Sequence, residues 1–178
     1  EERLGWPPLP GKYKVIRYEA PVAICTLNSD ELMEEIIDTQ HPRVSIVGSM
    51  NTENLGIERL IKNITTNPNI RFLILCGEDS RQAIGHLPGQ SLVSLFENGI
   101  DPVKKRIIGA KGKRPILRNV NFECLEQLKR QVQLINMIEC SDLADITETI
   151  DECSNKKVMP FMGGLNMDVT IEKIQAKT

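Results

Sequence analysis

The amino-acid sequence predicts an α/β fold built on an open, mostly parallel sheet with helices on both faces. Apolar runs rich in strand-forming residues alternate along the chain with segments whose apolar residues recur at helical spacing. Residues 70–75 are apolar except for Arg71, as expected for a central strand covered on both faces. A glycine-containing loop and a helix ended by Gly99 follow this run. Such strand–loop–helix units carry the ligand sites of α/β folds at the carboxyl edge of the sheet.

Composition limits the kinds of protein that this chain can be. Its 178 residues are enough for one domain, and its formal net charge of −2 argues against a nucleic-acid partner. The five cysteines include no C-x-x-C pair, which argues against a disulfide framework or a structural zinc site and favours the reducing cytoplasm. Because no apolar run approaches the roughly 20 residues that span a bilayer, we expect no transmembrane helix.

The first half of the chain predicts an arm followed by two strand–helix pairs. Trp6 and three prolines lie in the arm, where they favour an extended, turn-rich backbone packed on the body of the protein. The helices are amphipathic, with apolar residues of the second at positions i, i+3, i+4 and i+7. The expected elements are an arm over residues 1–20, strands over 22–27 and 44–48, and helices over 31–37 and 57–64.

The second half continues the alternation from the central strand. Residues 92–96 predict a helix, residues 106–108 a short strand, and residues 125–135 a long helix. The periodicity leaves residues 134–139 open between the end of that helix and an edge strand. A last helix is expected over residues 143–153. The α/β domain is expected to cover residues 21–153. Residues 154–178 are expected to form a loosely held tail without a transmembrane helix.

Three loops with glycine or small polar residues leave the predicted strands. They are residues 49–56 (SMNTENLG), 77–91 (GEDSRQAIGHLPGQS) and 109–113 (GAKGK). Because the carboxyl ends of parallel strands meet at one edge of a sheet, we expect these loops to converge on one crevice. The last loop lacks the G-x-x-x-x-G-K-[ST] spacing of a phosphate-binding loop and is more typical of a solvated turn with two lysines.

The loop over residues 49–56 has two interpretations. In one, Thr52 or Asn51 caps the following helix and Glu53 stabilises its positive end. In the other, the backbone amides of residues 54–56 face the phosphate or amide groups of a ligand. The sequence leaves both open.

Among the side chains of these loops, His86 is the strongest candidate for binding a ligand or a metal. The other histidine, His41, precedes a proline in an expected surface turn. A zinc or iron site made of side chains needs three or four ligands, and near His86 the sequence offers only Glu78 and Asp79. A loop histidine can be purely structural or solvated. A macrocycle such as haem or a corrinoid, however, supplies four equatorial nitrogens and asks the protein for one axial ligand.

Several stretches resemble the corrinoid-binding A subunit of tetrahydromethanopterin S-methyltransferase, with few gaps from about Gly5 to Cys153. They include GWPPLPGKY, NTENLGIERLIKNITTNPNIRFLILCGE and GHLPGQSLVSLFENGIDPVKKRIIGAKG. The paired motifs TENLGIE and GH-x-x-GQS make the resemblance specific. It implies a methanogenic archaeon and a Rossmann-like domain that holds a cobamide, either 5-hydroxybenzimidazolyl cobamide or cobalamin, with His86 as the lower axial ligand of cobalt.

The cofactor is expected to contact residues from all three loops, while no catalytic residue is expected in this chain. The expected contacts are Thr52, Glu53, Asn54, Leu55, Gly56, Gly85, His86, Leu87, Pro88, Gly89, Gln90, Gly109 and Ala110. The function implied by the resemblance is methyl carriage. Methyl-tetrahydromethanopterin would methylate cob(I)amide, coenzyme M would receive the methyl group through partner subunits or a soluble methyltransferase, and His86 would bind cobalt reversibly.

Two departures from related proteins keep alternatives open. The family's usual member has a C-terminal membrane helix, so either an anchor was removed or, as we expect, this is a soluble homologue, cytoplasmic or peripheral to a membrane complex. The loop also has Ile84 where the D-x-H-x-x-G signature of common cobalamin-binding domains has Asp. A backbone carbonyl, a water or Glu53 must then orient the second imidazole nitrogen. The alternatives are a corrinoid reservoir, a carrier for another methyl donor, and a flavodoxin-like nucleotide-binding module.

Overall fold

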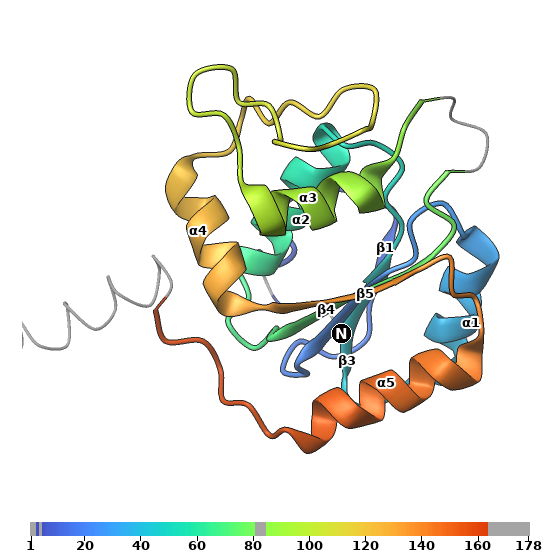
Figure 1. Cartoon of the computed structure of the whole chain (residues 1–178). Coiled ribbons are helices and arrows are strands. Elements are labelled where there is room, and N and C mark those ends of the chain that lie inside the picture. The colour runs from blue at the N-terminus through green and yellow to red at the C-terminus, as the bar shows by residue number, and fades with distance from the viewer. Residues whose placement is uncertain (1–2, 4, 81–84, 164–178) are drawn as a thin grey trace, which may run out of the picture.

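The protein, seen in a computed structural model, is built around a five-stranded sheet (Figure 1). The structure describes residue 3 and residues 5–80 and 85–163. The elements of this part of the chain are β1 (Tyr13–Val15), β2 (Val22–Cys25), α1 (Asp30–Thr39), β3 (Val44–Gly48), α2 (Leu55–Thr65), β4 (Phe72–Gly77), α3 (Pro88–Asn98), α4 (Phe122–Gln131), β5 (Gln133–Ile138) and α5 (Leu143–Asn155).

The sheet has the strand order β1-β3-β2-β4-β5. Strands β2, β3, β4 and β5 pair in parallel, and β1 pairs with β3 in the antiparallel direction. The connection after β2 leads to β3 on one side, whereas β4 and β5 extend the sheet on the other side of β2. The predicted open, mostly parallel α/β sheet is therefore confirmed, and the edge that carries the loops after β3 and β4 is its carboxyl edge.

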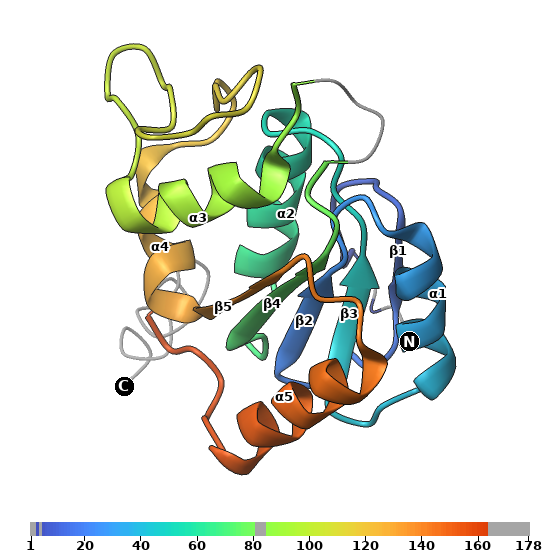
Figure 2. The same cartoon turned by 45° about the vertical axis from the view of Figure 1, so that its right-hand side comes forward.

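Helices cover both faces of the sheet, as predicted (Figures 1 and 2). Helices α2, α3 and α4 pack on one face and enclose one apolar core, while α1 and α5 enclose a second core on the other face. Alternate residues of β4 enter the two cores, with Leu73 and Leu75 in the first and Phe72 and Ile74 in the second. This double coverage explains the continuous apolar run in the sequence of β4.

Two predicted elements differ from the structure. The strand expected over residues 106–108 is wrong: Ile107 and Arg106 make only isolated bridges, to Ile100 and Ile116, and do not join the sheet. Residues 99–121 instead form an irregular excursion above α2 and α3 (Figure 1). The expected long helix ends at Gln131, and the ambiguous residues that follow form β5, which pairs with β4 over the full length of that strand. Pairing with β4, which lies far away in sequence, decides that these residues form a strand.

The chain on either side of the domain is tied to its body. Within residues 1–20, β1 joins the sheet, and Trp6 is buried with its Nε1 donating to the carbonyl oxygen of Asn63 in α2 at 2.7 Å. Residues 156–163, expected to be loosely held, contact the start of β4. There the amide of Phe161 donates to the carbonyl of Pro68 at 2.8 Å, and its ring lies beneath the guanidinium of Arg71. No helix of the described residues is long and apolar enough to cross a membrane.

Gln131, the last residue of α4, joins α4 to the turn between α2 and β4. The two hydrogens of its buried Nε2 group are shared among three carbonyl oxygens, those of Ile64 at 3.1 Å, Asn67 at 2.9 Å and Ile70 at 3.0 Å. Its Oε1 accepts from Nε2 of Gln127 at 3.1 Å. Buried carbonyl groups of a turn need such partners, because leaving them unpaired costs their desolvation free energy.

We predict that Gln131→Leu lowers the free energy of unfolding by about 1–3 kcal/mol, because leucine fills the space but leaves these carbonyls without a donor. The exposed Gln133, two residues later, provides the control, and Gln133→Leu should change the free energy by less than about 0.5 kcal/mol. Urea denaturation of both variants measures the difference. Equal stability of the two variants would contradict the role assigned to Gln131.

Candidate functional site

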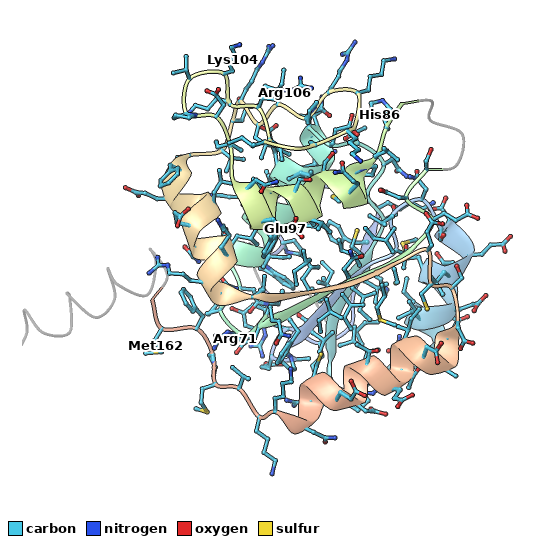
Figure 3. The ribbon with its side chains drawn as sticks, in the orientation of Figure 1. Arg71, His86, Glu97, Lys104, Arg106 and Met162 are labelled. Atoms are coloured by element: carbon cyan, nitrogen blue, oxygen red, sulfur yellow. The ribbon has the colours of Figure 1, made fainter. Side chains whose placement is uncertain are left out.

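His86 and Glu53 form a hydrogen-bonded pair at the carboxyl edge of the sheet. His86 lies in the connection between β4 and α3, and its Nδ1 is 2.8 Å from Oε1 of Glu53, which lies between β3 and α2. The Glu53 side chain is fully buried, whereas the His86 side chain is 21% exposed. Figure 3 labels His86 at the end of the molecule where these loops meet. The carboxyl group that orients the imidazole is thus Glu53, one of the three candidates that the sequence left open.

Glu53 accepts hydrogen bonds from three donors on two other segments. Besides the imidazole, the amide of Leu87 donates to Oε2 at 2.9 Å and the amide of Arg114 donates to Oε1 at 2.6 Å. Since both oxygens act as acceptors, Nδ1 of His86 carries a proton in this hydrogen-bond network. The imidazole is therefore held through Nδ1 by a buried group, and Nε2 is the ring nitrogen that does not contact Glu53.

The start of α2 explains why Glu53 turns away from its own helix. Asn54 is the N-cap residue and its Oδ1 accepts from the amide of Leu55 at 2.7 Å, while Oγ1 of Thr52 accepts from the amide of Gly56 at 2.9 Å. The prediction that Thr52 or Asn51 caps this helix is confirmed in part, because Thr52 accepts from an amide of the first turn while Asn54 occupies the N-cap position itself. Because these side chains already occupy the Leu55 and Gly56 amides, the structure does not support the interpretation in which those amides face a ligand.

Asp79 fixes the start of α3, and this helix begins two residues after His86. Its Oδ1 accepts from the amide of Gly89 at 2.6 Å and its Oδ2 from the amide of Gln90 at 2.9 Å. Burial raises the pKa of this carboxyl group, although the two amide bonds act in the opposite direction. A Cβ atom on Gly89 would lie 2.9 Å from Oδ1 of Asp79 and 2.8 Å from Cδ1 of Leu27, so only glycine fits this contact. The backbone after His86 is therefore held in place.

The third predicted loop reaches the same site, although no sheet strand precedes it. Gln90 holds it through both ends of its amide: Oε1 accepts from the amide of Lys111 at 2.8 Å, and Nε2 donates to the carbonyl of Gly109 at 3.1 Å. At Gly112 a Cβ atom would lie 2.7 Å from both Cδ and Oε2 of Glu53. A glycine at this position lets the backbone approach the buried carboxyl group closely.

Hydrogen bonds also link the loops at the carboxyl edge between β2 and β4, where the connections from these two strands lead to opposite sides of the sheet. Nδ2 of Asn28, just after β2, donates to the carbonyl oxygen of Asp79 at 2.6 Å, and Oδ1 of Asn28 accepts from Nδ2 of Asn51 at 2.6 Å. These bonds tie together the loops after β2, β3 and β4. The partly exposed imidazole consequently lies to one side of this point, between the loops after β3 and β4.

The three loops converge as the sequence predicts, but they do so through groups that the prediction did not single out. It missed Asp79 as the anchor of α3, and it missed Gly112 and the Arg114 amide as contacts of Glu53. The second glycine of GAKGK was the only sequence signal for Gly112. Ile84, at which the sequence departs from the D-x-H-x-x-G signature, lies outside the described residues. Within the described ranges, no group of three His, Cys, Asp or Glu side chains could hold a metal ion.

A cavity of about 310 Å³ lies elsewhere, between the N-terminal arm, the sheet and α2. Its lining is mostly apolar and includes Trp6, Ile46, Met50, Leu60 and Leu73, but neither Glu53 nor His86. The lining also includes Thr52, Leu55 and Gly56, three of the predicted cofactor contacts, so the cavity reaches the loop that carries Glu53.

Comparison with known proteins shows the family to which the sequence of this chain is similar. The family model for the A subunit of tetrahydromethanopterin S-methyltransferase matches residues 1–177. Relatives with this name include proteins of Methanocaldococcus jannaschii (44% identity, 85% of this chain, 61% of the relative) and Methanothermobacter marburgensis (the first of its A subunits; 43%, 85% and 61%). The second A subunit of Methanobrevibacter ruminantium is 44% identical over 85% of this chain and 75% of its own length.

The chain therefore spans about three fifths of the length of two of these relatives and three quarters of the third. The match of the family model over nearly every residue and the identity above 40% agree with the motifs around Glu53 and His86. The chain belongs to the family of tetrahydromethanopterin S-methyltransferase A subunits.

Proposed function

We propose that this protein binds a cobamide at the carboxyl edge of its sheet and serves as a methyl carrier, with His86 as the reversible lower axial ligand of cobalt. The observation that carries the proposal is the pair formed by His86 and Glu53. A buried carboxyl group holds Nδ1 at 2.8 Å and leaves Nε2 on a side chain that is still partly exposed. Metal-binding histidines are oriented by carboxyl groups in this way.

The residues of the site fit a metal that arrives inside a macrocycle. At the carboxyl edge, the described residues offer one imidazole, held by a buried carboxyl group, and the described part of the chain contains no cluster of three potential ligands. A corrin ring supplies four equatorial nitrogens, so one imidazole below the ring completes its lower side. Gly85 directly precedes His86 and lies next to Lys113, and hydrogen bonds to Gln90 hold the backbone of the 109–113 loop. Both stretches of backbone would line the ring.

The chain's own residues would control the position of the imidazole. Glu53 keeps the proton on Nδ1 and thereby directs the Nε2 lone pair outward. Asp79 holds the backbone at the start of α3, so a change in ligation requires movement of the His86 side chain rather than of the helix. A ligand that binds in one state of the metal and leaves in another needs this combination of a fixed backbone and a mobile side chain.

When bound, the cobamide supplies a cobalt centre that can accept and donate a methyl group. We infer that the methyl group comes from methyl-tetrahydromethanopterin and goes to coenzyme M. We assign no catalytic residue to this chain, and the groups that activate the donor and the acceptor would belong to other subunits or to a soluble methyltransferase. The name shared by the relatives, which is that of one subunit of a methyltransferase, supports this division of roles.

We predict that His86→Ala changes the visible spectrum of bound cob(III)alamin, because it removes the lower ligand. Glu53→Gln should weaken corrinoid binding by about 10- to 100-fold, because the amide can donate toward the imidazole and the Leu87 amide instead of accepting from them. Absorption titration of the purified protein measures both effects.

His41→Ala is the matched control for this experiment. His41 is the other histidine of the chain. It lies between α1 and β3 and pairs with Asp151 of α5, so the spectrum and the affinity should stay at wild-type values. An unchanged spectrum in His86→Ala would remove the ligand assignment. A yellow protein that binds flavin nucleotide instead would favour the flavodoxin-like alternative.

We predict that Gly112→Ala weakens corrinoid binding by about tenfold or more, because its Cβ atom would push Glu53 away from His86. Lys111→Ala, which shortens an exposed side chain in the same loop, should leave the affinity within about twofold. Wild-type affinity in Gly112→Ala would show that the position of Glu53 does not matter for binding.

Methyl transfer tests the carrier role separately from binding. We predict that the reduced, corrinoid-loaded protein becomes methylated by methyl-tetrahydromethanopterin when the partner methyltransferase subunits are added, and that coenzyme M then removes the methyl group. Mass spectrometry of the extracted corrinoid follows both steps. Binding without transfer would favour a corrinoid reservoir or a carrier for another methyl donor.

A further inference from the structure

Residues 104–118, which we call the basic segment, concentrate positive charge in a protein that is acidic as a whole. Seven of the chain's 22 Lys and Arg residues lie in it, and residues 102–120 contain no Asp or Glu. The remaining 15 basic residues face 24 acidic ones, so the rest of the chain carries a net charge of about −9. The seven are Lys104, Lys105, Arg106, Lys111, Lys113, Arg114 and Arg118.

These side chains are available for an interaction. Six of them are exposed and the seventh, Lys105, is partly exposed. None forms an ion pair with another residue that the structure describes. Figure 3 labels Lys104 and Arg106 on the excursion above α3, at the same end of the molecule as His86. The positive charge therefore borders the imidazole site.

The basic segment is held rigidly against the site by its backbone. Arg114 donates its amide to Glu53, and Asn119, just after the segment, donates its amide to Oε2 of Glu58 in α2 at 2.6 Å. Ile107 and Leu117 anchor the segment in the core. Because backbone amides and apolar side chains fix the segment, its basic side chains are not needed to hold it in place.

We propose that the basic segment is a docking surface for an acidic surface of a partner protein, one of the subunits that exchange the methyl group at His86. The proposal rests on the proposed function, because a carrier without a complete active site must present its cofactor to other proteins. A positive rim beside the reacting centre would guide an acidic partner onto it and set its orientation.

Apolar side chains within and beside the segment favour a protein over other anions. Val103 is 86% exposed, Ile108 49% and Leu55, at the start of α2, 52%. Exposed aliphatic groups between basic ones suit a protein interface, which combines an apolar centre with a charged rim. A small anion would instead need several donors that converge on one point. The acidic remainder of the chain would repel the extended charge of an anionic bilayer or a nucleic-acid duplex.

Charge reversal at four positions of the segment tests the proposal. The rim variant combines Lys104→Glu, Lys105→Glu, Arg106→Glu and Arg118→Glu, and leaves the loop of residues 109–113 and the residues next to Glu53 and Gly85 unchanged. The control variant combines Lys14→Glu, Arg17→Glu, Lys62→Glu and Lys129→Glu, which are exposed elsewhere and give the same change in net charge. The probe is the set of other tetrahydromethanopterin S-methyltransferase subunits of Methanothermobacter marburgensis, purified without the native methyl carrier of that complex, with binding followed by biolayer interferometry.

We expect the wild-type protein to bind these subunits with an association rate that falls as salt rises from about 0.02 to about 0.3 M. The rim variant should bind about tenfold more weakly or worse at low salt, and the control variant should stay within about threefold of wild type. The corrinoid spectrum of the rim variant should remain that of the wild type.

Other outcomes would overturn the proposal. Equal weakening in both variants would mean that net charge alone matters. Loss of corrinoid binding in the rim variant would assign the charges to the cofactor. Rim-dependent binding of phosphatidylglycerol vesicles, duplex DNA or inorganic phosphate, without binding of the subunits, would assign them to a membrane, a nucleic acid or a small anion. Failure of the wild-type protein to bind corrinoid would contradict the proposed function. The absorption spectrum measures corrinoid binding independently of docking, so the two failures can be told apart.

Discussion

One buried carboxyl group, that of Glu53, joins the three segments that make the candidate site. It accepts from the imidazole of His86, from the amide of the next residue and from the amide of Arg114 in the excursion between α3 and α4. A fully buried carboxyl group is stable only when its hydrogen-bonding capacity is used, and these three donors use it. The same bonds that satisfy Glu53 therefore fix the direction of the imidazole and the path of the basic segment.

The architecture around this group separates rigid parts from the part that must respond to a ligand. Asp79 and Asn28 bind the loops after β2 and β4 to one another, and Gly89 allows α3 to begin in close contact with Asp79. His86 lies just outside this network, with a partly exposed side chain. A site of this kind can exchange a ligand without disturbing the sheet, because the only group that has to move is a side chain.

The proposed function and the inferred docking surface are consequences of the same geometry. The excursion of residues 99–121 uses its backbone and its apolar residues to hold Glu53 and to complete the core, which leaves its basic side chains directed to the outside. The carboxyl edge thus presents an oriented imidazole beside a strip of positive charge. A methyl carrier needs both features, one to hold the cofactor and the other to bring the reacting group of another protein to it.

Local patterns in the sequence determined the alternation of strands and helices from β2 to α3, the carboxyl-edge position of the loops after β3 and β4, and the choice of His86 as the candidate ligand. These features follow from the spacing of apolar residues, from glycine and proline signals and from the chemistry of individual side chains, all of which act over short distances along the chain. The site motifs GH-x-x-GQS and TENLGIE belong to this local information, and they also carried the family resemblance.

The tertiary structure decided which partners these residues find. The sequence left Glu53 with two roles, at the positive end of its own helix or as a candidate partner of the imidazole. In the structure it pairs with the histidine 33 positions later and with an amide 61 positions later, and Asn54 occupies the N-cap position. Residues 106–108 were predicted to form a short strand, in which two isoleucines follow Arg106, yet the edge of the sheet is taken by β5, whose periodicity was ambiguous. Hydrogen-bond satisfaction of buried groups and the pairing of a sheet edge depend on segments far apart in sequence, so only the folded chain determines them.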